Sequence, residues 1–328
     1  MRTPINLRDL YLARRAIAPY IRTTPLLYSK SLSAHTRRQI YIKWENQQET
    51  GSFKLRGAAN RLSQLTAAER ARGVITVSTG NHGRGVATVA QQMGIRAVIC
   101  VPELVLPHKV AAMQQLGAEV IRHGQTQDDA ERHAEQLRRR EGLTWISAFD
   151  DPAIIAGQGT IGLEILEACP QVDTLIAPLS GGGLLGGIAI AMKAADPNIR
   201  TIGVSQAQGP AMYLSMEAGQ PVAVVEEPSL ADSLLGGIGL ENHYTFSLIQ
   251  MLVDEVVLVD EAEIAAAMAH ALREERQIIE GGGGVGIAAL LADKGSALGE
   301  HVVVIASGGN VDMQKLLRLT QSGWGAAT

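Results

Sequence analysis

The sequence predicts an α/β protein built from parallel sheets that are covered by helices. Short runs of β-branched residues alternate along the chain with glycine-bearing loops and helical patterns, and such alternation favours parallel strands joined by right-handed crossovers. The composition agrees, because the chain has 35 glycines and only 4% aromatic residues. A length of 328 residues with 46% hydrophobic content is sufficient for two domains.

The expected strands fall into two groups. Those of the first half are at residues 74–77, 97–101, 119–121 and 144–146. Those of the second half are at residues 175–177, 201–204, 256–259 and 301–305. We expect a small α/β domain at about residues 51–150, inserted into a large domain formed by residues 1–50 and 151–328.

Charge and hydropathy argue against nucleic acid and membrane as partners. The formal net charge is −4, and the short basic run at residues 138–140 is too small for a phosphate-binding surface. Residues 174–192 carry no charge, but Pro178 and three glycines interrupt them, which indicates a buried strand, a loop and a helix. Two cysteines, Cys100 and Cys169, form no disulfide framework, and residues 1–11 lack a signal-peptide core, so we expect a cytoplasmic protein.

A lysine stands at the predicted start of a helix. Residues 49–57 read ETGSFKLRG, in which Ser52 is a plausible N-cap for a helix at residues 53–65. Lys54 then falls in the first turn, where the helix dipole opposes its charge and lowers its pKa. A lowered pKa suits an amine that attacks a carbonyl group. The local sequence also fits a solvent-facing lysine.

Three further loops follow predicted strands. Residues 78–83 (STGNHG) open a helix and suit a substrate carboxylate, although a simple turn fits equally well. Residues 180–184 (SGGGL) present backbone amides to an anion, with phosphate as the natural occupant and close packing as the alternative. Ser307 after the last strand offers a neutral hydroxyl or a helix cap. An amine, a carboxylate loop, a phosphate loop and a hydroxyl together suggest a pyridoxal 5′-phosphate (PLP) site.

The order of these motifs resembles the serine/threonine dehydratase family of fold-type II PLP enzymes (tryptophan synthase β-like), which also contains serine racemase. The matching segments are residues 51–58 (GSFKLRGA), 78–83, 180–183 and 307–310 (SGGN). The resemblance extends from about Leu7 to Asp312. It implies two open parallel-sheet α/β domains with PLP in the cleft between them, and a homodimer.

The resemblance also implies roles for individual residues. Lys54 would form the Schiff base with PLP and later remove the substrate Cα proton, Phe53 would pack beside the ring, and Asn81 would bond its 3′-oxygen. The implied cofactor contacts are Phe53, Lys54, Asn81, Ser180, Gly181, Gly182, Gly183, Leu184, Gly236, Glu280 and Ser307. The implied substrate contacts are Ser78, Thr79, Gly80, Asn81 and His82. A helix-end role is an equal alternative for Glu280.

The implied reaction is β-elimination of water from L-threonine or L-serine, which gives a 2-oxo acid and ammonia. Ser307 beside the ring nitrogen would leave that nitrogen largely neutral, which disfavours a long-lived carbanion. Thr79 stands where racemases have a catalytic serine, so serine racemase-like activity is an alternative. Ser205, Gly209 and Ala211 offer no carboxylate where racemase-like members bind a divalent cation, and we expect no metal.

Residues 229–240 (SLADSLLGGIGL) narrow the resemblance further. They are similar to a short catabolic threonine dehydratase subgroup that is linked to hydroxyectoine utilization. A hydroxyectoine-derived amino acid is therefore a second substrate candidate. A cysteine-synthase-like transferase is disfavoured by His82 after Asn81 and by Phe53 before Lys54, and the intact motifs disfavour a non-catalytic binding protein.

Overall fold

The computed structural model describes residues 5–321 and contains two sheets. The larger has the strand order β1-β2-β10-β7-β8-β9 and the smaller the order β5-β4-β3-β6. The strands of the larger sheet are β1 (Leu26–Tyr28), β2 (Gln39–Trp44), β7 (Thr174–Pro178), β8 (Arg200–Gln206), β9 (Glu255–Val259) and β10 (His301–Ala306). Those of the smaller are β3 (Val74–Val77), β4 (Ala97–Val101), β5 (Glu119–Arg122) and β6 (Thr144–Trp145). The β1–β2 pair is antiparallel and the other recorded pairs are parallel.

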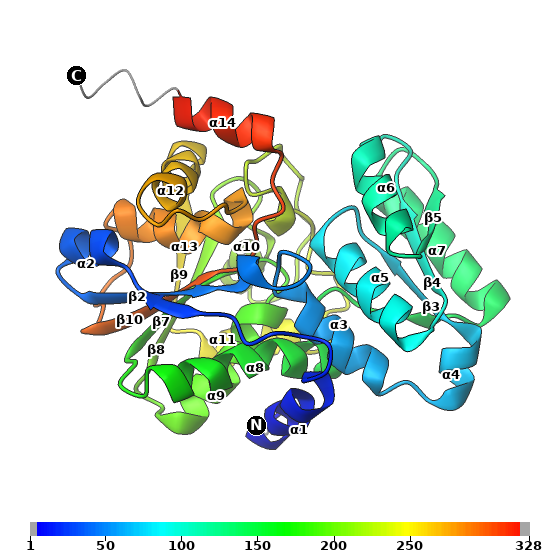
Figure 1. Cartoon of the computed structure of the whole chain (residues 1–328), viewed down its shortest axis with the longest axis horizontal. Coiled ribbons are helices and arrows are strands. Elements are labelled where there is room, and N and C mark those ends of the chain that lie inside the picture. The colour runs from blue at the N-terminus through cyan, green and yellow to red at the C-terminus, as the bar shows by residue number, and fades with distance from the viewer. Residues whose placement is uncertain (1–4, 322–328) are drawn as a thin grey trace.

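Helices cover both sheets, and the molecule has two lobes, one built around each sheet (Figure 1). The helices of the first half are α1 (Leu7–Ile17), α2 (Lys30–Thr36), α3 (Lys54–Ser63), α4 (Ala67–Arg72), α5 (Asn81–Met93), α6 (Pro107–Gln115) and α7 (Gln127–Glu141). Those of the second half are α8 (Pro152–Ala168), α9 (Gly183–Ala195), α10 (Ala211–Ala218), α11 (Thr245–Leu252), α12 (Glu261–Arg273), α13 (Gly281–Leu291) and α14 (Met313–Gln321). Two short 3-10 turns, η1 (Glu45–Gln47) and η2 (Asp232–Leu234), complete the set within the described residues.

The helix α3 lies between the two lobes. It packs against α5, which covers the smaller sheet, and against α8, which packs on α9 of the larger lobe. On the larger sheet, α13 packs against β7, β8, β9 and β10, while α9 packs against β7 and β8. The start of α3 is therefore held where the two lobes meet.

The expected α/β class and the eight expected strands are confirmed, with ends that shift by one or two residues. The interpretation of residues 174–192 is also correct, since they form β7, a glycine loop and most of α9. Residues 5–321 contain no helix that is long and apolar enough to cross a membrane. The strands of the smaller sheet all fall within residues 74–145, while the domain edges near residues 50 and 150 stay a prediction.

The predicted cap of α3 is wrong. The helix begins at Lys54, with Phe53 at the N-cap position and no side-chain cap. Ser52 is instead buried, and its hydroxyl has no hydrogen-bond partner within the described part of the chain. Ser52 pairs through its backbone with Gly308 in an isolated β-bridge, so a contact distant in sequence replaces the local cap.

Candidate active site

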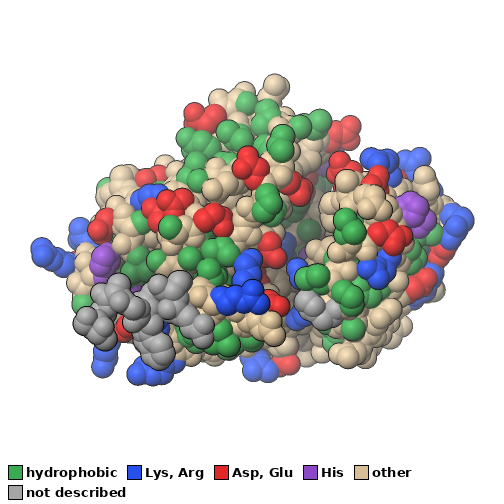
Figure 2. Space-filling model, turned by 90° about the horizontal axis from the view of Figure 1, so that it is seen from above, with side chains coloured by type: hydrophobic (Ala, Val, Ile, Leu, Met, Phe, Trp, Pro, Cys, Tyr) green, Lys and Arg blue, Asp and Glu red, His purple; other side chains and the backbone are tan. Residues whose placement is uncertain are grey.

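A cavity of about 730 Å³ opens between the two lobes. Figure 2 shows the surface hollowed at this place. Its volume is in the range of pockets that hold small ligands. The cavity brings together all the predicted site residues, namely Phe53, Lys54, Ser78, Thr79, Gly80, Asn81, His82, Ser180, Gly181, Gly182, Gly183, Leu184, Gly236, Glu280 and Ser307.

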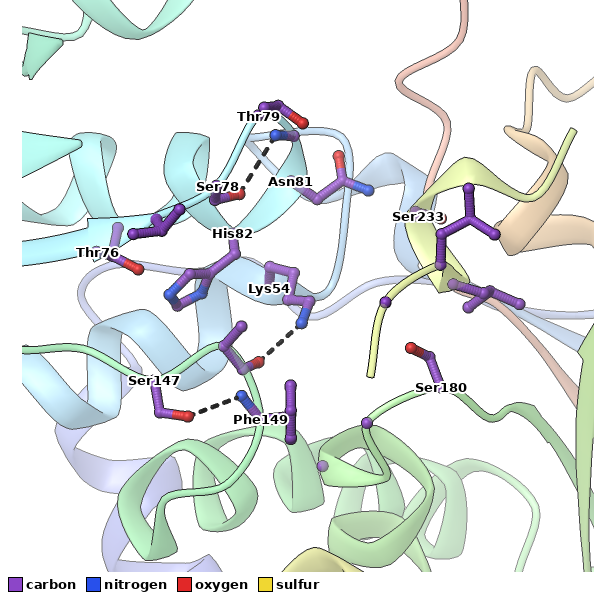
Figure 3. A pocket seen from close by; sticks show the side chains of 18 of the residues that line it. Lys54, Thr76, Ser78, Thr79, Asn81, His82, Ser147, Phe149, Ser180 and Ser233 are labelled. Atoms are coloured by element: carbon purple, nitrogen blue, oxygen red, sulfur yellow. Dashed lines mark hydrogen bonds between the residues drawn. The ribbon is translucent and has the colours of Figure 1, made fainter. Parts of the chain in front are cut away.

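Lys54 presents its amine to this cavity from the first turn of α3. The Nζ atom donates a hydrogen bond to the carbonyl oxygen of Ala148 at 2.8 Å (Figure 3) and lies 5.3 Å from the ring centre of Phe53. Burial lowers the pKa of Lys54 to about 8, although the Glu280 carboxylate acts in the opposite direction. The amine is therefore much closer to neutrality at physiological pH than an ordinary lysine.

The loop after β3 is ordered by its own side chains. The Ser78 hydroxyl accepts hydrogen bonds from the backbone N–H groups of Gly80 at 3.3 Å and Gly83 at 3.0 Å. The Thr79 and Asn81 side chains lie on the same side of the cavity in Figure 3. Because α5 begins at Asn81, its free backbone N–H groups and its dipole favour a carboxylate at this end of the cavity.

His82 is held neutral beneath this loop. Its side chain is buried, and Nε2 lies 3.2 Å from the carbonyl oxygen of Ile146. Burial, with a smaller contribution from Lys54, lowers the pKa of His82 to about 3. Because a carbonyl oxygen only accepts, the contact favours the tautomer with its proton on Nε2.

Glu280 and Asn81 meet across the cavity. The Nδ2 atom of Asn81 donates to Oε1 of Glu280 at 2.7 Å, and Oδ1 of Asn81 accepts from Nδ2 of Asn310 at 2.7 Å. Burial raises the pKa of Glu280 to about 7, against the hydrogen bonds from Ser233 and Asn81. Glu280 is the residue before α13 and also lines the cavity. A helix-end position and a place near the cofactor are therefore compatible.

The glycine loop at residues 180–183 leads into α9. Gly182 has a φ of 85°, which favours glycine, and α9 begins at Gly183. A Cβ atom on Gly181 would lie 2.3 Å from Cγ of Phe149. The loop therefore needs its glycines to approach Phe149, and it aims the free N–H groups of a helix N-terminus at the cavity.

The residues present fit PLP. An amine with a lowered pKa and an anion-binding glycine loop line one cavity, and Ser307 lies in its wall with 4% of its surface exposed. The Ser180 hydroxyl points into the space near the end of Lys54 (Figure 3). The backbone N–H of Phe53 bonds the carbonyl oxygen of Ser307 at 3.1 Å, which ties the lysine segment to the serine segment. The amine can react with an aldehyde, the N–H groups of the glycine loop can bind a phosphate, and the Ser307 hydroxyl can donate to a neutral ring nitrogen.

Several lining residues were missed by the sequence analysis. Ala148 and Phe149 follow the short strand β6, and Ser233 belongs to η2. A lone aromatic residue in a polar loop carries no local signal of a site. Asn310 lay inside a recognised motif but had been given no role. In residues 5–321, no group of three or more His, Cys, Asp or Glu side chains is placed to hold a metal ion.

Comparisons with known proteins agree with this geometry. A protein of Sinorhizobium fredii, provisionally named a threonine dehydratase, is 52% identical over 94% of this chain and 93% of its own length. The L-threonine ammonia-lyase of Thermotoga maritima is 40% identical over 97% of this chain and 79% of its own length. The structure of maize serine racemase superposes with a TM-score of 0.91 at 32% identity, covering 97% of both chains.

A family model described as "Pyridoxal-phosphate dependent enzyme" matches residues 17–308. The match includes the lysine segment, the loop at residues 78–83, the glycine loop and Ser307, which are the parts that line the cavity. This chain therefore belongs to the family of pyridoxal-phosphate-dependent enzymes.

Proposed function

We propose that this enzyme is a PLP-dependent ammonia-lyase that removes water from a hydroxy amino acid such as L-threonine or L-serine, releasing a 2-oxo acid and ammonia. The observation that carries the proposal is the placement of Lys54, the glycine loop and Ser307 around one cavity. The relatives named for threonine dehydratase and threonine ammonia-lyase support the same reaction.

Different residues of the cavity act on the substrate Cα proton and on the substrate carboxylate. The Lys54 amine takes up the Cα proton at Nζ, and its lowered pKa keeps an appreciable neutral fraction available for this step. The N-terminus of α5 and the loop at residues 78–82 bind the substrate carboxylate. His82 stays neutral near this loop, so the carboxylate is bound by hydrogen bonds and the helix dipole and not by an imidazolium ion.

Cofactor binding assigns the other side of the cavity. The glycine loop and the N-terminus of α9 would hold the phosphate, Phe53 would pack beside the ring, and Ser307 would meet the ring nitrogen. When bound, PLP supplies an electron-withdrawing ring that acidifies the substrate Cα–H bond. A hydroxyl at position 307 would leave the ring nitrogen without a carboxylate partner, and this would favour prompt loss of the β-hydroxyl group.

Two alternatives rest on specific features. Thr79 lines the cavity and the maize racemase shares the fold, so the Thr79 hydroxyl is the candidate acid/base for racemization. The cavity also extends to Gln127, Asp128 and Glu131 on α7, which leaves room for a larger substrate such as a hydroxyectoine-derived amino acid.

A homodimer and a cytoplasmic location remain predictions, and two buried free cysteines support the cytoplasmic location.

The test is a screen for 2-oxo acid release over L-threonine, L-serine, 3-hydroxyaspartate and hydroxyectoine-derived amino acids. We expect 2-oxobutanoate from L-threonine or pyruvate from L-serine, with an equal amount of ammonia. Chiral analysis of the remaining serine measures D-serine in the same samples, and Thr79→Ala should lower the rate of racemization by a larger factor than the rate of elimination. A holoenzyme that releases no 2-oxo acid from any of these compounds would overturn the proposed reaction.

A further inference from the structure

A line of hydrogen bonds joins the two lobes beside the cavity. Nη1 of Arg84 donates to Oδ1 of Asn310 at 2.9 Å, and Nδ2 of Asn310 donates to Oδ1 of Asn81 at 2.7 Å. The line ends where Nδ2 of Asn81 donates to Oε1 of Glu280 at 2.7 Å. Arg84 and Asn81 belong to α5, whereas Asn310 follows β10 and Glu280 precedes α13. Three segments that are distant in sequence are thereby connected at the wall of the site.

The guanidinium group of Arg84 and the carbonyl group of Thr50 decide which atoms donate and which accept along this line. A guanidinium group only donates, and a backbone carbonyl only accepts. Asn310 lies between one of each, because its Nδ2 also donates to the carbonyl oxygen of Thr50 at 2.8 Å. Turning the Asn310 amide over would place donor against donor at Arg84 and acceptor against acceptor at Thr50. Asn81 must then receive a hydrogen bond on Oδ1, which leaves its Nδ2 for Glu280.

We propose that Arg84 and Asn310 are positioning residues that fix the direction of the Asn81 amide and so hold the Glu280 carboxyl group against the cavity wall. The inference deepens the proposed function and rests on it, because Asn81 is a proposed cofactor contact. With Nδ2 facing Glu280, the second N–H of Asn81 is a donor that the fold has aimed in advance. Such preorganisation is what a site needs to bind an oxygen anion without rearranging.

The packing around Glu280 agrees with a held carboxyl group. Asn310 also donates its backbone N–H to Glu280, so it supports this residue both directly and through Asn81. A Cβ atom on Gly308 would lie 2.8 Å from Oε1 of Glu280. Gly308 therefore permits an approach that no other residue would allow without displacing the carboxyl group.

The charged groups that act on Glu280 come from two other elements. Lys54 on α3 interacts with it, and Asp232 in η2 raises the pKa of Glu280 further. Asp232 is itself 3.6 Å from the amine of Lys109 on α6. Against burial and Asp232, the donated hydrogen bond from Asn81 favours the charged carboxylate. Loosening the Asn81 amide should therefore raise the pKa of Glu280.

The first test titrates Glu280 in the apoprotein. Glutamate is labelled with ¹³C at Cδ, and the resonance that is missing from Glu280→Gln is followed by NMR from pH 5 to 9. We expect Arg84→Met to raise the pKa of Glu280 by about one unit, as loss of a hydrogen bond to a charged group implies. Arg84→Lys, which remains a pure donor, should leave the pKa near that of the wild type.

Arg84→Gln separates charge from hydrogen bonding, since it keeps an N–H donor without a positive charge. We expect its effect to be well below that of Arg84→Met. An equal shift in these two variants, or a Glu280 pKa that is the same in all of them, would overturn the proposal. Asn310→Ser serves as a second variant and should raise the pKa of Glu280 in the same direction, so the test stands even if Arg84→Met does not fold.

The second readout is the dissociation constant of PLP, measured by absorbance without any amino acid substrate. We expect Arg84→Met to weaken PLP binding by about tenfold and Arg84→Lys to leave it near the wild-type value. Unchanged PLP binding in Arg84→Met would contradict the positioning role. Neither measurement depends on which amino acid the enzyme consumes, so a failure here is distinct from a failure of the proposed reaction.

Discussion

The Nζ atom of Lys54 lies 2.8 Å from the carbonyl oxygen of Ala148. Within residues 5–321 its recorded hydrogen bond is to this neutral acceptor and to no carboxylate. A neutral carbonyl holds an amine less strongly than an ion pair does. Lys54 is therefore oriented into the cavity while it remains free to lose its proton and react with an aldehyde.

Replacement of this amine should abolish both cofactor attachment and turnover. We expect Lys54→Ala to lose at least about 10³-fold in 2-oxo acid release, because it removes both the attachment point and the base. The visible absorption of the bound cofactor should disappear as well. Lys30→Ala, at the exposed start of α2, is the matched control and should behave as wild type. Persistent visible absorbance of the wild-type form in Lys54→Ala would contradict the assignment.

The rate at which the apoprotein takes up PLP should follow the titration of Lys54. A protonated amine does not attack an aldehyde, so the rate should rise with pH through about 8 and then level off. The Glu280 carboxylate raises the pKa of Lys54, so Glu280→Gln should move the midpoint below that of the wild type. Glu217→Gln, an exposed change on α10, should leave it in place. A midpoint close to the ordinary lysine value of 10.5 would be incompatible with a buried reactive amine.

Much of the site could be predicted from the sequence because three of its loops come directly after strands. The carboxyl ends of parallel strands meet at one edge of a sheet, so residues 180–184 after β7 and 307–310 after β10 lie at the same edge of the larger sheet. Residues 78–83 follow β3 of the smaller sheet, and it is the packing of the two lobes that brings them to the same cavity. Their glycines and hydroxyls were visible locally. The structure adds Ala148 and Phe149, whose position depends on how the segment after β6 returns to α8.

Other features depended on contacts that no local pattern records. The strand β2 was not predicted, and one reason is that Lys43 interrupts its apolar run. Lys43 is buried because its amine bonds Glu164 of α8 at 2.5 Å. Ser52 was predicted to cap α3 by its side chain, but its pairing with Gly308 decides the local geometry instead. Both errors arise where tertiary structure overrides local preference.

Adding a side chain to the glycine loop should weaken PLP binding, and removing the side chain that it overlaps should restore part of the affinity. A Cβ atom on Gly181 would overlap the ring of Phe149 at 2.3 Å, so Gly181→Ala forces the ring or the loop to move. Overpacking of this kind costs about 1–3 kcal/mol, which corresponds to a rise of about five- to 150-fold in the PLP dissociation constant.

Two comparisons make this test specific. Adding Phe149→Ala to Gly181→Ala removes the overlapping ring and should recover part of the lost affinity. Gly237→Ala changes another lining glycine whose Cβ atom would meet nothing closer than 3.9 Å, so it should have little effect. If Gly181→Ala binds PLP as tightly as Gly237→Ala does, the close contact between the glycine loop and Phe149 does not control PLP binding.

A buried group of charges supports the lysine-bearing helix from behind. Arg56, two residues after Lys54, bonds Glu45 through Nε at 2.9 Å and Glu164 through Nη1 at 2.6 Å. Arg56 and Glu45 are fully buried, and Lys43 balances the second carboxylate. Burial opposes the charge of Arg56, but the two carboxylates raise its pKa. The cluster therefore pairs two basic side chains with two carboxylic ones, so that its charges balance.

Breaking this cluster should be far more costly than breaking a surface ion pair. Arg56→Met leaves Glu45 and Glu164 buried with too little positive charge, which should lower the free energy of unfolding by about 3–5 kcal/mol. Arg14→Met removes an exposed partner of Glu167 and should cost about 1 kcal/mol or less. Urea denaturation of the apoproteins measures both. Arg56→Lys keeps the charge but not the planar fork, so it should fall between them; equal losses in Arg56→Met and Arg14→Met would show that the buried cluster does not anchor α3.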